Sequence, residues 1–159
     1  MISSTLCYLF KDGRYLMLHR TKKEHDANRD KWIGIGGKFE EGESPEDCMR
    51  REVLEETGLS VTCFRYSGIV TFVSDRWKGE FMHLVLITDW TGTLRTCDEG
   101  DLEWVAEEKM PQLPAWAGDK IFFSLMNRGG PFFSLKLTYA GEDLLSAELD
   151  GRPIDPSDY

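Results

Sequence analysis

The sequence predicts an α+β fold in which helices cover the faces of a mixed β-sheet. Two observations support this prediction: most of the structured segments read as strands, and only two segments have helical spacing. The chain has 159 residues, of which 41% are hydrophobic, so it is long enough for one domain with a core and too short for two ordinary ones. We therefore expect one domain over residues 1–150 and a polar, frayed tail over residues 151–159.

The predicted strands are short apolar segments that turn residues separate. Lys11-Asp12-Gly13 turns the chain between the first two strands, and Ala140-Gly141-Glu142-Asp143 closes a hairpin near the end. The charged stretch from Arg20 to Lys31 reads as a loop. The predicted strands cover residues 5–10, 14–19, 61–73, 81–89, 102–105, 132–139 and 144–149.

The first predicted helix has a start signal and a stop signal. Ser44 is a good N-cap residue, and Pro45 suits the first helical position because its missing N–H has no partner there. Gly58 is a natural C′ residue, so the helix should end at about Thr57. The second helix is expected over residues 119–126, where large apolar residues recur at helical spacing.

The formal net charge of -9 excludes some partners and favours others. An acidic surface repels polyanions, so we expect neither a nucleic-acid polymer nor a membrane as partner. A small phosphate ligand needs cations to screen it, which points to a divalent metal ion. The N-terminus lacks a basic stretch followed by an apolar run, and no segment approaches membrane-spanning length, so the expected location is the cytoplasm.

The first helix carries three carboxylates on one face. Glu52, Glu55 and Glu56 are spaced i, i+3 and i+4, and no Lys or Arg follows at i+4 of the last two, where Leu59 and Ser60 stand. Carboxylate oxygens without nearby cations suit Mg²⁺, which prefers oxygen ligands. The alternative is a solvated acidic face, which is common on helices.

The segment around this helix resembles the signature of the Nudix family. It follows the pattern G-x5-E-x7-R-E-U-x-E-E-x-G-U, in which U is a bulky aliphatic residue, and it covers about a seventh of the chain. Every position of the pattern is filled, by Gly37, Glu43, Arg51, Glu52, Val53, Glu55, Glu56, Gly58 and Leu59. The resemblance implies an α/β/α sandwich and a Mg²⁺-dependent hydrolase, with Mn²⁺ as a possible substitute.

The resemblance also implies roles for single residues. It makes Glu52, Glu55, Glu56 and the carbonyl of Gly37 metal ligands, with one glutamate acting as general base. Glu99 resembles the acid that MutT-type members carry outside the signature, which would make it both a ligand and a catalytic residue; the alternative is a loop carboxylate in solvent. Structural roles fall to Glu43 and Arg51, which would pair across the loop and helix, and to Gly58, which permits the helix exit.

Two further segments resemble oxidised-purine nucleoside triphosphatases of the MutT type. They are Lys31-Trp32-Ile33-Gly34-Ile35-Gly36-Gly37-Lys38 and Trp116-Ala117-Gly118-Asp119. The resemblance implies that Trp116 stacks on a purine and that Asp119 binds its edge; the alternative for Trp116 is ordinary packing. This chain departs from the subgroup at Ile33, where an asparagine is usual, and at Gly118, where a second acid is usual. The expected substrate-binding residues are Trp32, Ile33, Lys38, Lys23, Trp116 and Asp119.

The predicted function is hydrolysis of a nucleoside triphosphate, such as 8-oxo-dGTP, to the monophosphate and pyrophosphate, an activity that serves DNA repair. The expected partner is thus a small nucleotide, and the chain would act as a monomer or homodimer. One alternative is a Nudix pyrophosphatase for ADP-ribose, dinucleoside polyphosphates or another nucleoside diphosphate derivative. A second is a domain that senses nucleotides without turnover. Lys22, Lys23 and Arg20 are candidates for phosphate contacts, unless they form an ordinary solvated charge run.

Overall fold

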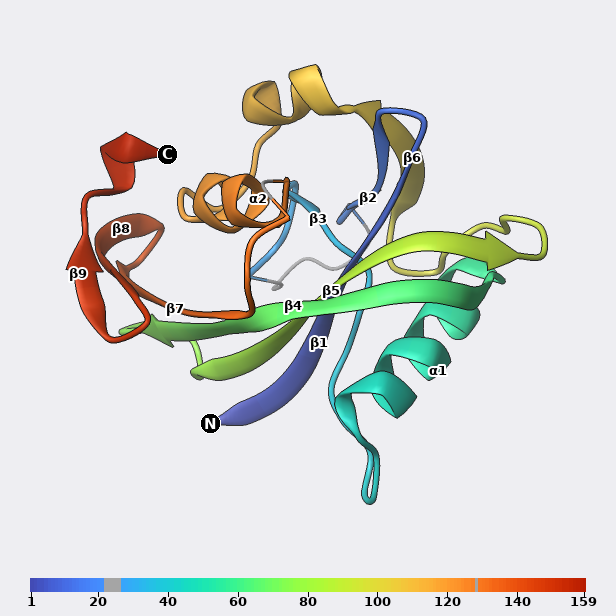
Figure 1. Ribbon diagram of the computed structural model, residues 1–159, viewed down its shortest axis with the longest axis horizontal. Helices are drawn as coiled ribbons and strands as arrows, with labels where there is room; N and C mark the ends of the chain where they lie inside the picture. The colour runs from blue at the N-terminus through green and yellow to red at the C-terminus, as the bar shows by residue number, and fades with distance from the viewer. Residues whose placement is uncertain (22–26, 128) are drawn as a thin grey trace.

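A mixed β-sheet with one α-helix on each face organises the molecule (Figure 1). The computed structural model describes residues 1–21, 27–127 and 129–159. Within these ranges nine strands form the sheet in the order β3-β2-β1-β5-β4-β7-β8-β9, and β6 pairs with β2. Helix α1 (Pro45–Thr57) packs against one face and helix α2 (Asp119–Asn127) against the other. The predicted fold class is confirmed.

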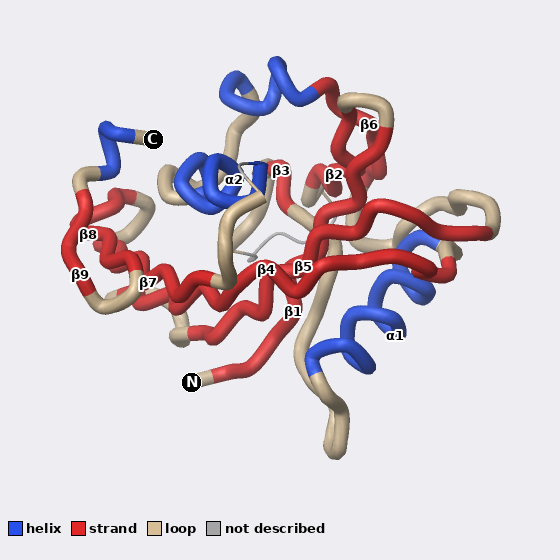
Figure 2. The backbone as a smooth tube through the Cα atoms, viewed as in Figure 1, coloured by secondary structure: helices blue, strands red, loops and turns tan. Residues whose placement is uncertain are grey.

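The observed strands overlap every predicted one and extend most of them (Figure 2). β1 pairs in parallel with β5, and β4 pairs in parallel with β7, whereas the other strand pairs are antiparallel. Two short 3-10 helices follow β6 and β9, at Glu107–Gln112 and Pro156–Asp158. The strands are β1 (Ile2–Lys11), β2 (Arg14–His19), β3 (Trp32–Ile33), β4 (Ser60–Ser74), β5 (Glu80–Thr91), β6 (Asp101–Ala106), β7 (Phe133–Ala140), β8 (Asp143–Leu149) and β9 (Arg152–Ile154).

Alternation along β1 shows how the sheet separates two apolar cores. Tyr8 packs into the core beneath α2, whereas Cys7 and Leu9 point to the opposite face and pack into the core beneath α1. Because both faces are buried, the register of β1 is strongly fixed. Each helix contributes fully buried side chains to its own core, such as Val53 from α1 and Phe122 from α2.

Helix α1 begins and ends where the sequence predicts. The hydroxyl of Ser44 accepts a hydrogen bond from the backbone N–H of Asp47, and the Asp47 carboxylate accepts one from the N–H of Ser44. This reciprocal pair is a capping box. Gly58 ends the helix in the left-handed region with φ of 79°, where a residue without a Cβ is favoured. These two ends fix which way each glutamate of α1 points.

The C-terminal segment differs from the frayed tail expected over residues 151–159. Strand β9 extends the sheet by pairing with β8, and Ile154 lies opposite Ala147. Ile154 and Tyr159 pack against the core beneath α2. The expectation is wrong because these two apolar side chains offset the entropy cost of ordering a polar segment. Neither helix in the described ranges has the length and apolar composition to span a membrane.

Candidate active site

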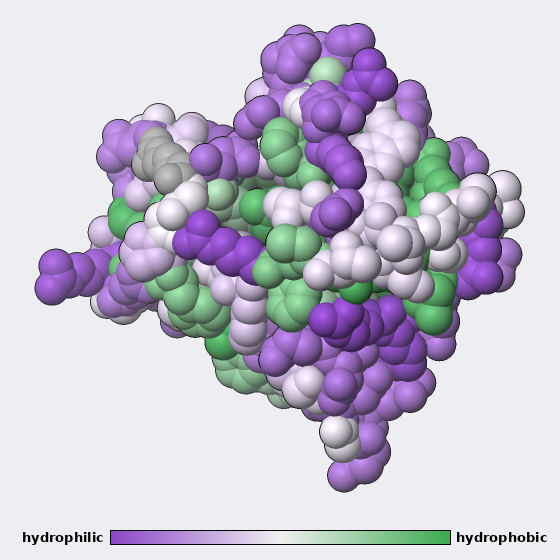
Figure 3. Space-filling view, turned by 45° about the vertical axis from the view of Figure 1, so that its right-hand side comes forward, coloured by the Kyte–Doolittle hydropathy of each residue, from purple (hydrophilic) through white to green (hydrophobic). Residues whose placement is uncertain are grey.

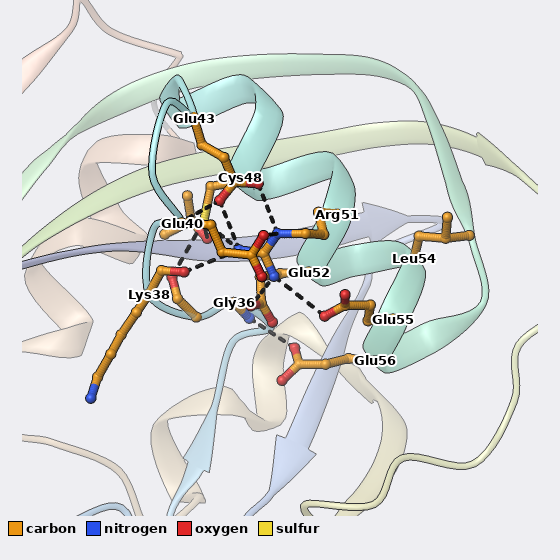
Figure 4. A network of polar contacts seen from close by, with 12 residues as sticks. Gly36, Lys38, Glu40, Glu43, Cys48, Arg51, Glu52, Leu54, Glu55 and Glu56 are labelled. Carbon is orange, nitrogen blue, oxygen red and sulfur yellow. Dashed lines mark hydrogen bonds and ion pairs between the residues drawn. The ribbon is translucent and has the colours of Figure 1, made fainter.

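Arg51 joins the loop before α1 to the acidic face of the helix (Figure 4). Its Nε and Nη2 atoms donate to the two carboxylate oxygens of Glu43 at 2.7 and 2.8 Å, and Nη2 also donates to the carbonyl of Lys38 at 3.1 Å. This fork geometry is the strong form of an ion pair. The hydrogen bonds from the Arg51 guanidinium and, to a smaller extent, one from the backbone N–H of Glu40 lower the pKa of Glu43 to about 2. The predicted pairing of Glu43 with Arg51 is confirmed.

The same guanidinium also neutralises part of the glutamate cluster. Its Nη1 atom lies 2.7 Å from a carboxylate oxygen of Glu52 and 3.3 Å from one of Glu55. The expectation that no cation lies near this acidic face is therefore wrong. Arg51, in the turn that precedes Glu55 rather than in the turn that follows it, reduces the repulsion between the carboxylates. The Glu55 side chain is 59% exposed and points toward Arg51, whereas the Glu52 side chain is 15% exposed.

Two glycines bring the loop against the helix. The N–H of Gly36 donates to the carboxylate of Glu56 at 3.0 Å, and a Cβ on Gly36 would lie 2.0 Å from the carbonyl oxygen of Thr5. A Cβ on Gly37 would lie 2.5 Å from the carboxyl carbon of Glu52. The carbonyl of Gly37 accepts the N–H of Thr5 at 2.9 Å. Only residues without a side chain allow the loop and both carboxylates to approach so closely.

Glu56 and Glu99 form a pair of adjacent carboxyl groups. Burial, followed by the hydrogen bond with Glu99, raises the pKa of Glu56 to about 9. On its other side Glu99 accepts a hydrogen bond from Arg20 at 2.9 Å. Glu99 is thus not a loop carboxylate in solvent. Arg20, a candidate for phosphate contacts, is instead paired with this acid in the structure.

The donor chemistry here fits a hard divalent cation. Glu52, Glu56 and Glu99 supply only oxygen atoms, and Glu52 and Glu99 both add negative charge near the buried Glu56. A cation would favour the ionised form of Glu56, which burial opposes. Within the described ranges, no three acidic, histidine or cysteine side chains are already drawn together as a ligand set. The lower part of the molecule, where α1 and the turn before it lie, has a hydrophilic surface (Figure 3).

A pocket of about 590 Å³ brings together three of the expected substrate-binding residues. Trp32, Trp116 and Asp119 all line it, from β3, the loop before α2 and the first turn of α2. Burial raises the pKa of the Asp119 carboxyl to about 8. A chain of contacts links the pocket to the carboxylates: the His19 ring stacks on Trp32 with centroids 4.5 Å apart, and the next residue, Arg20, binds Glu99.

Two of the remaining expected substrate-binding residues, Ile33 and Lys38, do not line this pocket. Ile33 points to the opposite face of β3 from Trp32 and packs against the core beneath α1, so it does not line the pocket. The side chain of Lys38 is exposed and points away from the glutamates (Figure 4). Lys22 and Lys23 lie outside the described residues. The expectation for Ile33 is wrong because residues 32–33 form a strand, which was not predicted. Successive side chains of a strand point to opposite faces, so Ile33 points away from Trp32.

Comparison with known proteins assigns the chain to a family. The family model of the NUDIX domain matches residues 2–126. The chain belongs to the Nudix family.

Curated Nudix relatives match most of the chain. It is 32% identical to the uncharacterised Nudix hydrolase YvcI of Bacillus subtilis, over 94% of this chain and 95% of that protein. It is 30% identical to the oxidized purine nucleoside triphosphate hydrolase of Danio rerio, over 89% of this chain and 88% of that protein. The MutT protein of Bacillus halodurans has the same fold, with a TM-score of 0.83 and 28% identity over 96% of this chain and 100% of that one. The chain is a Nudix hydrolase.

Sequence reasoning missed several contacts around the pocket and the carboxylates. Lys31 and Asn28 contact the ring of Trp116, yet both were read as part of a charged loop. The only signal for Lys31 was its place directly before Trp32 in the segment that resembles the oxidised-purine enzymes. The pairing of Arg20 with Glu99 joins residues 79 positions apart, so local spacing gave no signal for it.

Proposed function

We propose that this Nudix hydrolase cleaves a nucleoside triphosphate, an oxidised purine such as 8-oxo-dGTP, to the monophosphate and pyrophosphate with Mg²⁺ or Mn²⁺. The observation that carries the proposal is the chain of contacts that links the Trp32–Trp116–Asp119 pocket, through His19 and Arg20, to Glu99. A pocket of about 590 Å³ is within the range of small-molecule sites. The similarity to oxidized purine nucleoside triphosphate hydrolases over most of the chain supports the same substrate class.

The main metal ligands in this proposal are Glu52, Glu56 and Glu99. The other two candidate ligands, Glu55 and the Gly37 carbonyl, are secondary to these three. A bound divalent cation would neutralise phosphate charge and favour attack by water. The chain itself orients these ligands: the Gly36 N–H holds Glu56, and Arg51 holds Glu52. A carboxylate that is not engaged by the cation would accept the proton of the attacking water.

Recognition of the base in this proposal falls to Trp116 and Asp119. An indole offers a flat apolar surface for a purine ring, and a carboxyl in its protonated form both donates and accepts hydrogen bonds. Burial favours the protonated form of Asp119 at neutral pH, because it raises the pKa to about 8. A protonated acid suits the edge of an oxidised purine, which presents both carbonyl oxygens and N–H groups.

The test is a substrate panel with product identification. Purified protein is assayed with Mg²⁺ or Mn²⁺ on 8-oxo-dGTP, dGTP, dATP, ADP-ribose and diadenosine tetraphosphate, and kcat/KM is compared. We expect the highest value for an oxidised purine triphosphate, with the monophosphate and pyrophosphate as products. The highest value for ADP-ribose or the dinucleotide would favour the alternative pyrophosphatase.

Two further outcomes count against the proposal. Release of no phosphate or pyrophosphate from any nucleotide would refute hydrolysis. A nucleotide-induced rise in Tm without any turnover would identify the domain as a sensor. The matched control is Glu56→Gln, which keeps the shape of the side chain but removes its charge, and which should lose the activity.

A further inference from the structure

The ring of Trp116 is fixed in its plane by neighbouring aromatic rings and one hydrogen bond. Phe72, Trp77 and Tyr139 meet it at interplanar angles of 73°, 89° and 74°, with centroid distances of 5.3, 5.4 and 4.9 Å. Its Nε1–H donates to the side-chain oxygen of Asn28 at 2.7 Å. The ring is therefore held by a polar contact at its Nε1–H and by T-shaped packing with three aromatic rings.

An ammonium group covers the indole from outside the pocket. Nζ of Lys31 lies 4.7 Å from the ring centroid of Trp116. The same ammonium is ion-paired with Glu142 of the turn between β7 and β8, and it contacts the carbonyl of Ala27 at 3.4 Å. Only 13% of the Lys31 side chain is exposed, whereas 61% of the Glu142 side chain is. A cation over an aromatic ring is attracted more strongly when it is desolvated in this way.

Lys31 does not reach the pocket that Trp116 shares with Trp32 and Asp119. It lines a separate hollow of about 380 Å³, together with Trp116 and Glu142. Trp116 thus lines both hollows, whereas Lys31 lines only the second one. We propose that Lys31 is a positioning residue that holds Trp116 in place for stacking of a purine base.

This inference rests on the proposed function, since it takes the substrate to be a purine nucleotide. A ring that is already held in its binding orientation loses little freedom when the base stacks on it, so binding becomes tighter. Lys31 lines only the second hollow and not the base pocket, and its ion-pair partner is Glu142 rather than a glutamate of the proposed metal site. Its removal should therefore weaken nucleotide binding and leave the chemical step unchanged.

The test compares Lys31→Met and Lys31→Arg with a matched control, Lys11→Met. Lys11 has the same kind of contacts, an ion pair with Asp89 at 3.0 Å and a ring contact with Trp90 at 5.4 Å, but it lines neither pocket. The probe for binding is 8-oxo-dGMP, whose Kd is measured by calorimetry without metal and without turnover.

For Lys31→Met we expect Kd and KM to rise about tenfold while kcat stays within about twofold. Lys31→Arg should restore binding because a guanidinium also stacks on aromatic rings. Lys11→Met should match the wild type. Wild-type binding by Lys31→Met, or no rescue by arginine, would overturn the inference. Failure of the wild type itself to bind 8-oxo-dGMP would instead count against the proposed substrate.

Lys31 also lowers the pKa of Asp119, so it could act on nucleotide binding through Asp119 instead of Trp116. Double-mutant cycles separate these two routes. We expect Lys31→Met to have no effect on Kd when Trp116→Ala is already present. It should keep its tenfold effect when Asp119→Asn is present. The opposite pattern, with the effect lost only in the Asp119→Asn background, would overturn the assignment of Lys31 to Trp116.

Discussion

Substitution of Gly37 by alanine would displace one metal-ligand candidate without disturbing the core. The new Cβ would lie 2.5 Å from the carboxyl carbon of Glu52, and ordinary contact begins at 3.4 Å, so the carboxylate must move by about 0.9 Å. The Glu52 carboxylate is the end of a flexible side chain, so it can yield. A misplacement of about 1 Å at a reacting centre can cost about 10²-fold in rate, which is about 2.7 kcal/mol. We therefore expect kcat/KM of Gly37→Ala to fall by about 10²-fold.

The assay measures kcat/KM across a Mg²⁺ titration and Tm for three alanine variants. Gly37→Ala should keep a Tm near that of the wild type, since Gly37 does not have a positive φ. Gly36→Ala should lower Tm strongly, because its Cβ would meet the backbone carbonyl of Thr5 at 2.0 Å. Gly130→Ala, whose Cβ would meet nothing within 4 Å, is the neutral control. Wild-type kcat/KM and wild-type Mg²⁺ dependence in Gly37→Ala would refute the reasoning.

Three further predictions concern single side chains of the site. Glu56, with its pKa raised to about 9, holds a proton at neutral pH that Mg²⁺ must displace, so the affinity for Mg²⁺ should rise with pH. Calorimetry of Mg²⁺ binding in two buffers should detect the release of this proton by the wild type and not by Glu56→Gln. Asp119 has a folded pKa of about 8 against 3.8 unfolded, so stability falls as pH rises between these values, by at most about 1.4 kcal/mol per pH unit. In urea unfolding, the free energy of unfolding of Asp119→Asn relative to that of the wild type should rise from pH 5 to pH 8. The same difference in free energy at both pH values would contradict this. Trp116→Ala should raise KM more than it lowers kcat, and an unchanged KM would remove Trp116 from the site.

The features that could be predicted from the sequence are those that neighbouring residues determine. Ser44, Pro45 and Gly58 act within one or two turns of their own positions, so the bounds of α1 followed directly from residue types. The pairing of Glu43 with Arg51 was also predictable, because the family pattern places both residues. The sheet order and its parallel pairs were not predicted beyond the mixed class, since strand pairing depends on contacts distant in sequence.

The features that were missed depend on tertiary contacts. Arg51 relieves Glu55 from the preceding turn, so a search of only the following i+4 positions overlooked it. Ile33 is turned away from the pocket because residues 32–33 pair with β2 as a strand, whereas the glycines after them favoured a loop. Ile154 and Tyr159 are ordered by packing on a core that is assembled from the rest of the chain. None of these contacts is visible in local spacing.

The most direct test of the metal centre is anomalous diffraction from crystals of the protein soaked in Mn²⁺. If the oxygen atoms of Glu52, Glu56 and Glu99 hold the cation, a peak should appear among these three carboxylates, beside the loop at Gly36 and Gly37. The peak should be lost in crystals of Glu56→Gln. A map from well-soaked crystals without a peak there, with the three side chains in their present positions, would contradict the assignment of this site as the metal centre of the hydrolase.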